Sequence, residues 1–142
     1  MDSSVKDTDL GNIWLFSACR PNELRRIRKA VEEVTVPAGR ELCSEASMGK
    51  EFFLILRGRA SVVRRGRKIA TLGPGQYFGE LSLLDKQPRS ASVVADTEMH
   101  LLVMEYRRFH GILDEMPSIA TRLLSAMAVR LRGADAKAFA NS

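Results

Sequence analysis

The middle of this 142-residue sequence consists of short apolar runs separated by glycine-containing turns. In chain order the runs are VTV, EFFLIL, RASVV, RKIATL, SASVVA and MHLLVM, and the glycines that separate them are Gly39, Gly58, Gly66, Gly73 and Gly75. Runs this short and rich in valine, isoleucine and phenylalanine are typical of β-strands, because a buried helix needs about ten or more residues. Many short strands with glycine-rich turns favour an antiparallel sandwich or a barrel-like roll.

Helical periodicity is found at the two ends of the chain. Apolar residues recur at steps of three and four after Pro21, which predicts a helix over about residues 21–33. A second such pattern begins at Pro117 and predicts a helix over residues 118 to about 132 that ends or frays at Gly133. Because strands and helices do not alternate, this order indicates a single α+β domain rather than a doubly wound parallel sheet.

The composition narrows the possible functions. A formal net charge of +5 favours an anionic partner, which is a nucleic acid, a membrane surface or a small phosphorylated ligand. The two histidines, His100 and His110, have no metal-binding spacing and are predicted to be packing or surface residues, so we expect neither a metal nor an enzyme activity. Cys19 and Cys43 form no CxxC pair or disulfide framework and are predicted to be small buried apolar residues.

Other features of the chain have a structural interpretation. No stretch approaches the roughly 20 apolar residues of a membrane-spanning helix, and the acidic, polar start is unlike a signal peptide, so the expected location is cytoplasmic. The basic clusters within residues 25–29 and 64–68 are interpreted as a solvated helix face and as protection of a strand edge, rather than as a nucleic-acid site. Trp14 and Phe16 are predicted to pack the first helical segment onto the strands.

The segment at residues 73–95, GPGQYFGELSLLDKQPRSASVVA, carries the chemistry. Gly79 lets the backbone approach a ligand closely, and the amides that open a short helix after it favour a phosphate. Arg89 can bind the same phosphate with two parallel hydrogen bonds, and Ser90 can donate a hydroxyl. A carboxylate at Glu80 is suited to accept hydrogen bonds from sugar hydroxyls. The pattern therefore predicts a site for a ribose-phosphate.

The strings FGELSLL at Phe78–Leu84 and PRSASV at Pro88–Val93 closely resemble the phosphate-binding cassette of cyclic nucleotide-binding domains. These domains occur in bacterial catabolite activator proteins, in protein kinase A regulatory subunits and in nucleotide-gated channels. The resemblance extends over about residues 15–132 and implies a jelly-roll-like antiparallel β-roll flanked by N-terminal and C-terminal helices. It implies one domain over residues 1–142 that binds a cyclic mononucleotide, cAMP in preference to cGMP, as a regulatory sensor without enzyme activity.

Carried across by position, the resemblance gives each cassette residue a role. Glu80 would bind the ribose 2′-hydroxyl, Arg89 and Ser90 the cyclic phosphate, and the amides of Gly79, Leu81 and Ala91 would help to hold it. The last helix would close over the base as a lid. The implied cassette residues are Phe78, Gly79, Glu80, Leu81, Ser82, Arg89, Ser90 and Ala91, and the implied lid residues are Met127, Arg130, Leu131 and Ala134.

The sequence departs from the family pattern in two places. Lys50 stands where an aspartate is common, in a turn at residues 45–50 that we expect to lie away from the cassette. No helix-turn-helix segment follows the last helix, so we expect no sequence-specific nucleic-acid binding by this chain, and the effector is expected to be another protein or domain. Two alternatives remain open, a degenerate cassette that serves as an interaction scaffold and a cGMP-selective sensor.

Overall fold

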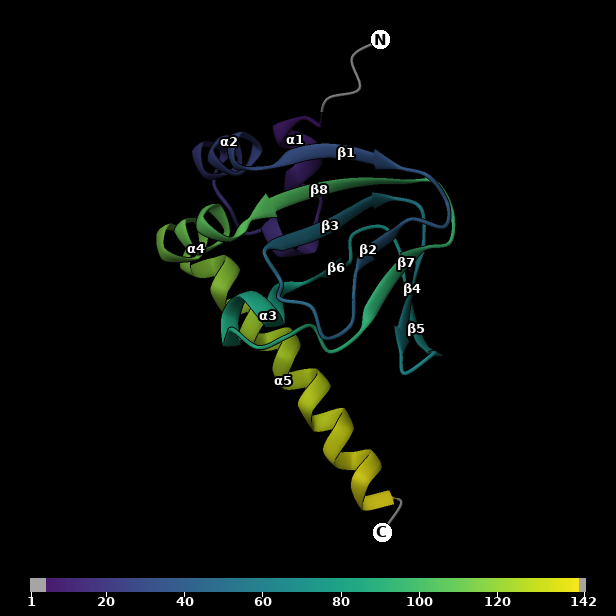
Figure 1. The fold of residues 1–142 in the computed structure, drawn as a ribbon. Coiled ribbons are helices and arrows are strands. Elements are labelled where there is room, and N and C mark those ends of the chain that lie inside the picture. The colour runs from purple at the N-terminus through teal and green to yellow at the C-terminus, as the bar shows by residue number, and fades with distance from the viewer. Residues whose placement is uncertain (1–4, 141–142) are drawn as a thin grey trace.

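The computed structural model describes residues 5–140, with side chains described as far as Gly133. Within these residues the chain forms two antiparallel sheets, and several helices gather at one end of them (Figure 1). The elements are α1 (Asp7–Gly11), the 3-10 turn η1 (Trp14–Phe16), α2 (Pro21–Ala30), β1 (Glu32–Val36), β2 (Glu41–Cys43), β3 (Glu51–Arg57), β4 (Ala60–Arg64), β5 (Arg67–Leu72), β6 (Tyr77–Phe78), α3 (Glu80–Asp85), β7 (Ser92–Ala95), β8 (Met99–Glu105), α4 (Tyr106–Glu115) and α5 (Pro117–Ala140).

The two sheets have the strand orders β1-β8-β3-β6 and β2-β7-β4-β5. Strands β3 and β8 are apolar without alternation because both of their faces are buried. On β8, Leu101 and Val103 face the core between the sheets, whereas Leu102 and Met104 belong to the core that the helices share with the first sheet. The predicted antiparallel β-roll with flanking helices is therefore confirmed. The helical core also includes Val5, which precedes residue 15, where the resemblance to the family was predicted to begin.

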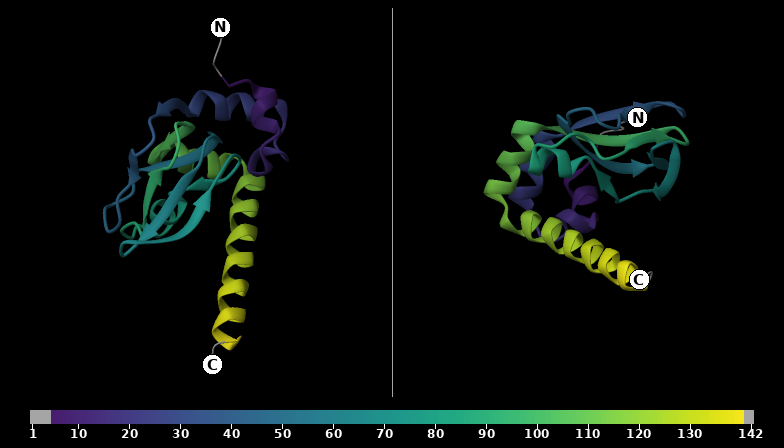
Figure 2. Two further views of the ribbon diagram at one scale, coloured as in Figure 1. Left: turned by 90° about the vertical axis from the view of Figure 1, so that its right-hand side faces the viewer. Right: turned by 60° about the horizontal axis from the view of Figure 1, so that its bottom comes forward.

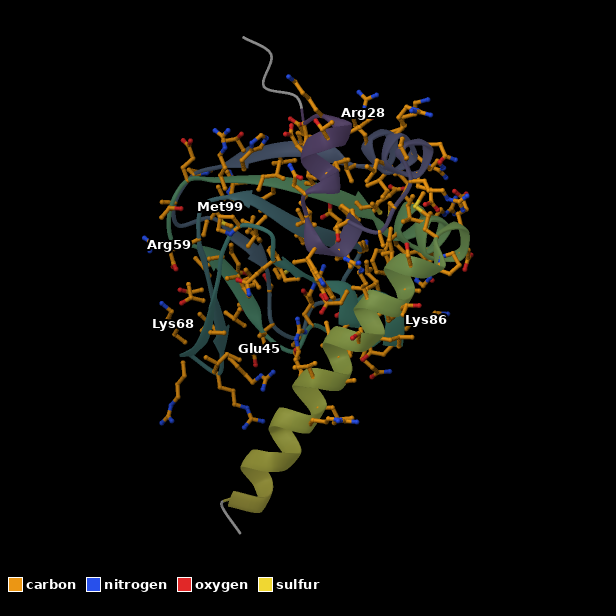
Figure 3. All side chains as sticks on the ribbon, turned by 180° about the vertical axis from the view of Figure 1, so that it is seen from behind. Arg28, Glu45, Arg59, Lys68, Lys86 and Met99 are labelled. Carbon is orange, nitrogen blue, oxygen red and sulfur yellow. The ribbon has the colours of Figure 1, made fainter. Side chains whose placement is uncertain are left out.

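The turn between β4 and β5 closes an antiparallel hairpin. Arg65 and Gly66 have φ values of 52° and 75°, so both central residues are left-handed, as a tight two-residue turn requires. Arg64 pairs with Arg67 across the turn. Figure 3 shows that Lys68 on β5 and Arg28 on α2 lie on separate parts of the surface, so the two basic clusters do not form one patch.

Two helix boundaries differ from the prediction. α2 ends at Ala30 and not near residue 33, because Val34 already pairs with Leu101 in the first sheet. α5 neither ends nor frays at Gly133 but continues to Ala140. A glycine costs a helix only about 1 kcal/mol, and the alanine-rich sequence that follows offsets this cost. The short strands β2 and β6 were not predicted, since they have few residues and no clear pattern.

The start of α5 is packed and its remainder projects away from the body (Figure 2). Leu123 is buried in the helical core, but Leu131 is 64% exposed. Phe16 is buried as predicted, whereas the prediction for Trp14 is wrong, because its side chain is half exposed and lies against Arg122 of α5. Within the described residues, neither α5 nor any other helix has the length and apolar character needed to cross a membrane.

Candidate functional site

A cavity of about 580 Å³ lies between the cassette, strands β4 and β5, and one residue of α5. The predicted site residues on its wall are Phe78, Gly79, Glu80, Leu81, Ser82, Arg89, Ser90, Ala91 and Arg130. Two predicted lid residues are not on the wall. Met127 is half-buried elsewhere, and Leu131 is exposed to solvent. The side chain of Ala134 lies outside the described residues.

Arg89 is the most constrained polar residue of the cavity wall. Its Nη2 donates a hydrogen bond to the backbone carbonyl of Glu51 at 2.9 Å, and its guanidinium carbon lies 6.0 Å from the ring centroid of Phe53. Its Nη1 is buried and has no hydrogen-bond partner among the described residues. A buried charged donor without a partner is costly, so the arrangement favours an anion beside Nη1.

Two glycines provide the space that the Arg89 side chain occupies. Gly79 has a φ of +92°, and a Cβ there would lie 2.6 Å from Nη1 of Arg89 and 2.7 Å from the Glu51 carbonyl oxygen. A Cβ at Gly49 would lie 2.9 Å from Cζ of Arg89 and 2.6 Å from Cβ of Ser82. Any side chain at either position would displace the guanidinium. Sequence reasoning missed Gly49, because its neighbour Arg89 is far away in the chain.

The turn at residues 45–50 packs directly against the cassette, so the expectation that it lies apart is wrong. The Ala46 amide donates to the Arg89 carbonyl at 2.8 Å, and the Arg89 amide donates to the Ser47 carbonyl at 2.7 Å. A β-bridge joins Met48 to Pro88. The backbone of Arg89 is therefore held on both its polar groups by a segment that begins about forty residues earlier.

Glu80 begins α3 and is only 3% exposed. Its Oε1 accepts a hydrogen bond from Nη1 of Arg130 at 3.3 Å, which links the cassette to α5. Arg130 itself is more than half exposed. The same pair acts on Tyr77, where burial raises the pKa of the phenol, the negative charge of Glu80 raises it further and Arg130 opposes this effect.

The remaining wall is formed by the second sheet and its neighbours. Nε of Arg64 donates to the Ser90 carbonyl at 3.0 Å and so ties β4 to the end of the cassette. Cys43 is buried in the core between the sheets, as predicted for a small apolar residue, and burial raises the pKa of its thiol to about 11. Cys19 is only partly buried, on the helical side of the molecule.

The histidines lie away from the cavity wall. Nε2 of His100 lies 3.5 Å from Glu33, and His110 contacts the Leu83 carbonyl. Over the part of the chain that the structure describes, no group of three histidine, cysteine or acidic residues is placed to hold a metal ion.

The fold and the cavity are those of a small-ligand-binding module with one fixed arginine and one buried carboxylate. The family model described as "Cyclic nucleotide-binding domain" matches residues 33–116. The chain therefore belongs to the cyclic nucleotide-binding domain family, and the resemblance seen in the cassette is confirmed. The family is one of binding modules, which agrees with the prediction that the domain is not an enzyme.

Relatives of known name support this assignment. The chain is 32% identical over 126 residues to the cyclic AMP receptor protein of Thermus thermophilus, covering 85% of this chain and 58% of that protein. It is 33% identical over 115 residues to the cAMP-dependent protein kinase regulatory subunit of Neurospora crassa, covering 80% of this chain and 30% of the subunit. The chain thus spans little more than half, or less, of these relatives.

Solved structures give the same fold. The catabolite activator protein of Thermus thermophilus superposes with a TM-score of 0.80 at 32% identity, over 87% of this chain and 60% of that one. The N-terminal domain of a transcriptional regulator from Streptomyces coelicolor superposes with a TM-score of 0.69 at 33% identity, over 88% of this chain and 93% of that one. The second comparison shows that this fold also occurs over nearly the whole of a chain of similar size.

Proposed function

We propose that this chain binds cAMP in the cavity, with the cyclic phosphate at Arg89, and that it acts as a regulatory sensor. The observation that carries the proposal is Nη1 of Arg89, a buried cationic donor without a partner among the described residues. A phosphate oxygen would satisfy this donor, and the exposed hydroxyl of Ser90 lies on the same wall. The names of the Thermus and Neurospora relatives, which both refer to cAMP, support this choice of ligand.

The ribose is proposed to lie at Glu80. Arg130 contacts one oxygen of this carboxylate at 3.3 Å, and a carboxylate has further acceptor sites for a 2′-hydroxyl. The base would then lie along β5, where Ile69 is half exposed and faces the cavity. A cavity of about 580 Å³ is within the usual range for small-molecule sites, which is about 300–1,000 Å³.

The output of the sensor is proposed to pass through α5. This helix contacts the cavity through Arg130, whereas Leu124, Val129 and Leu131 on it are exposed. A ligand that changes the Arg130 contact can shift α5 from one position to another only if it binds the protein more tightly with α5 in the second position. Because the named relatives are longer than this chain, we propose that the effector is a partner protein or a further domain.

Calorimetric titration of cAMP, cGMP and 2′-deoxy-cAMP into the purified chain tests the proposal. We expect cAMP to bind more tightly than cGMP. We expect the deoxy ligand to bind about tenfold to 150-fold more weakly, because one hydrogen bond to a charged group is worth about 1.5–3 kcal/mol. Equal affinities for cAMP and its deoxy form would remove Glu80 from the ribose site. Binding of none of the three would favour a degenerate cassette that serves as a scaffold, and tighter binding of cGMP would identify a cGMP sensor.

A further inference from the structure

One polar contact joins the cassette helix α3 to α4. The last carbonyls of a helix have no partner within it, so they need partners from elsewhere. At the end of α3, the Ser82 carbonyl accepts the Lys86 amide at 3.1 Å. The Leu83 carbonyl instead lies 3.0 Å from Nε2 of His110 on α4. Because a carbonyl oxygen only accepts, Nε2 is the donor of this hydrogen bond.

The imidazole of His110 is held by its neighbours on α4. The ring centroid of His110 lies 4.6 Å from that of Tyr106 and 5.8 Å from that of Phe109. The Leu83 side chain is fully buried in the same helical core as Phe109. The Leu83 carbonyl is therefore joined to α4, and its side chain lies in the helical core to which α4 contributes.

Only Met116 separates α4 from α5 in the chain. Met116 is 2% exposed, so this joint is packed in the core. We propose that His110 is a positioning residue whose hydrogen bond to Leu83 couples the cassette to α5. This inference rests on the proposed function, since a phosphate at Arg89 is what would draw α3 toward the ligand.

The chain contains its own reporter for a movement of α5. Trp14 is the single tryptophan of the sequence, and its ring centroid lies 5.2 Å from the guanidinium carbon of Arg122 on α5. A shift of the first turns of α5 changes this contact and with it the tryptophan fluorescence. The histidines supply a matched control, because Nε2 of His100 lies 3.5 Å from Glu33 on β1, far from α3 in the chain.

The experiment compares His110→Phe, His110→Gln and His100→Phe. Phenylalanine keeps a ring between Tyr106 and Phe109 but removes the donor, whereas glutamine keeps an N–H donor. On addition of saturating cAMP, we expect the fluorescence change of His110→Phe to fall to less than half of the wild-type change. We expect His110→Gln and His100→Phe to keep most of it. A wild-type response in His110→Phe, or an equal loss in His110→Phe and His110→Gln, overturns the proposal.

A measurement without ligand separates this proposal from the proposed function. Loss of one hydrogen bond should raise the rate of amide hydrogen exchange in α3 about two- to tenfold in His110→Phe, relative to His100→Phe. Unchanged exchange in α3 means that the contact carries no coupling and overturns the proposal, whatever the ligand does. A wild-type chain that binds no cyclic nucleotide by calorimetry overturns the proposed function instead, and the coupling is then judged by exchange alone.

Discussion

The two walls of the cavity, the cassette and α5, differ in how tightly their polar side chains are held. On the cassette wall, the Arg89 side chain donates to the Glu51 carbonyl, its backbone pairs with Ser47, and its guanidinium occupies space that a side chain at position 79 would fill. On the opposite wall, among the residues that the structure describes, α5 contributes only Arg130. That side chain is more than half exposed and contacts Glu80 at 3.3 Å.

This difference suggests separate roles, in which the cassette wall supplies affinity for the ligand and α5 supplies the movement that signals binding. The Arg89 side chain and backbone are already held in place, so the contacts that Arg89 makes need little rearrangement and contribute mainly to affinity. Beyond its packed first turns, α5 is joined to the cassette by one ion pair whose arginine is more than half exposed, and solvent screening limits the contribution of such a pair to about 0–1 kcal/mol. A small difference in ligand contacts, made at Arg130 or passed on through α3 and α4, can therefore move α5.

The largest effect should come from removing the fixed cation. We expect Arg89→Ala to weaken cAMP binding by about 150- to 25,000-fold, because the two N–H groups of Nη1 would each lose a charge-assisted hydrogen bond to the phosphate of about 1.5–3 kcal/mol. Arg89→Lys should lose less, since an ammonium keeps the charge but not the planar geometry. Calorimetry measures both, with Arg59→Ala on the turn after β3 as the control. An unchanged affinity in Arg89→Ala would mean that the cassette wall is not the source of affinity.

Cys43, which lines the cavity, tests how well water is excluded from the cassette wall. Burial raises the pKa of Cys43 from about 9 to about 11. Because the folded state holds this proton more tightly, the thiol stabilises the fold fully below about pH 9, and that contribution is lost as the pH rises through 11. A shift of this size corresponds to about 2–3 kcal/mol.

Urea unfolding at pH 8 and pH 11 measures this contribution. The wild type should lose about 2–3 kcal/mol more stability between the two pH values than Cys43→Ala does. Burial is also the main cause that raises the pKa of Cys19, which lies near α5 with its Sγ 3.9 Å from Oγ of Ser118. Because Cys19 is only partly buried, Cys19→Ala should change the pH dependence less. Identical pH profiles for the wild type and Cys43→Ala would contradict a dry cassette wall.

Alanine substitutions at two glycines, Gly79 and Gly75, test how closely the cassette is packed. Gly79 and Gly75 both have a positive φ, but a Cβ at Gly75 would meet no described atom within 4 Å. Gly75→Ala should therefore lose about 1 kcal/mol from backbone strain alone. Gly79→Ala should lose about 1–3 kcal/mol more, from the clash with Arg89. Thermal or urea unfolding compares the two variants, and equal losses would show that the guanidinium moves aside freely.

The cassette could be predicted because its polar residues lie close together in the chain. Glu80 and Arg89 are separated by one short helix, so their chemistry is visible as a local pattern. The strand runs could also be predicted, since burial on both faces makes β3 and β8 continuously apolar. The cassette and these strands are each defined by residues that are close together in the sequence, and such local patterns can be predicted.

The contacts that position the cassette could not be predicted, because they join distant segments. Gly49 looks like an ordinary turn glycine until Arg89 is placed beside it. The partner of Glu80 is Arg130, fifty residues later, and its choice depends on the rotation of α5 about its axis. That rotation is set by the packing of residues such as Leu123 in the helical core. The sequence shows that these residues are apolar, but it does not show how they pack.

The smallest effect should come from the α5 wall. Arg130→Ala removes the ion pair with Glu80, and we expect the free energy of unfolding to fall by no more than about 1 kcal/mol, because solvent screens the exposed guanidinium. Urea unfolding at low and high salt measures this loss, which should shrink at high salt. Arg132→Ala, at an exposed position two residues further along α5, is the matched control. A loss above about 2 kcal/mol that persists at high salt would place Arg130 among the firmly held contacts, like those of a buried pair. The cavity would then have two fixed walls, and α5 would have to move as one body with the cassette rather than against it.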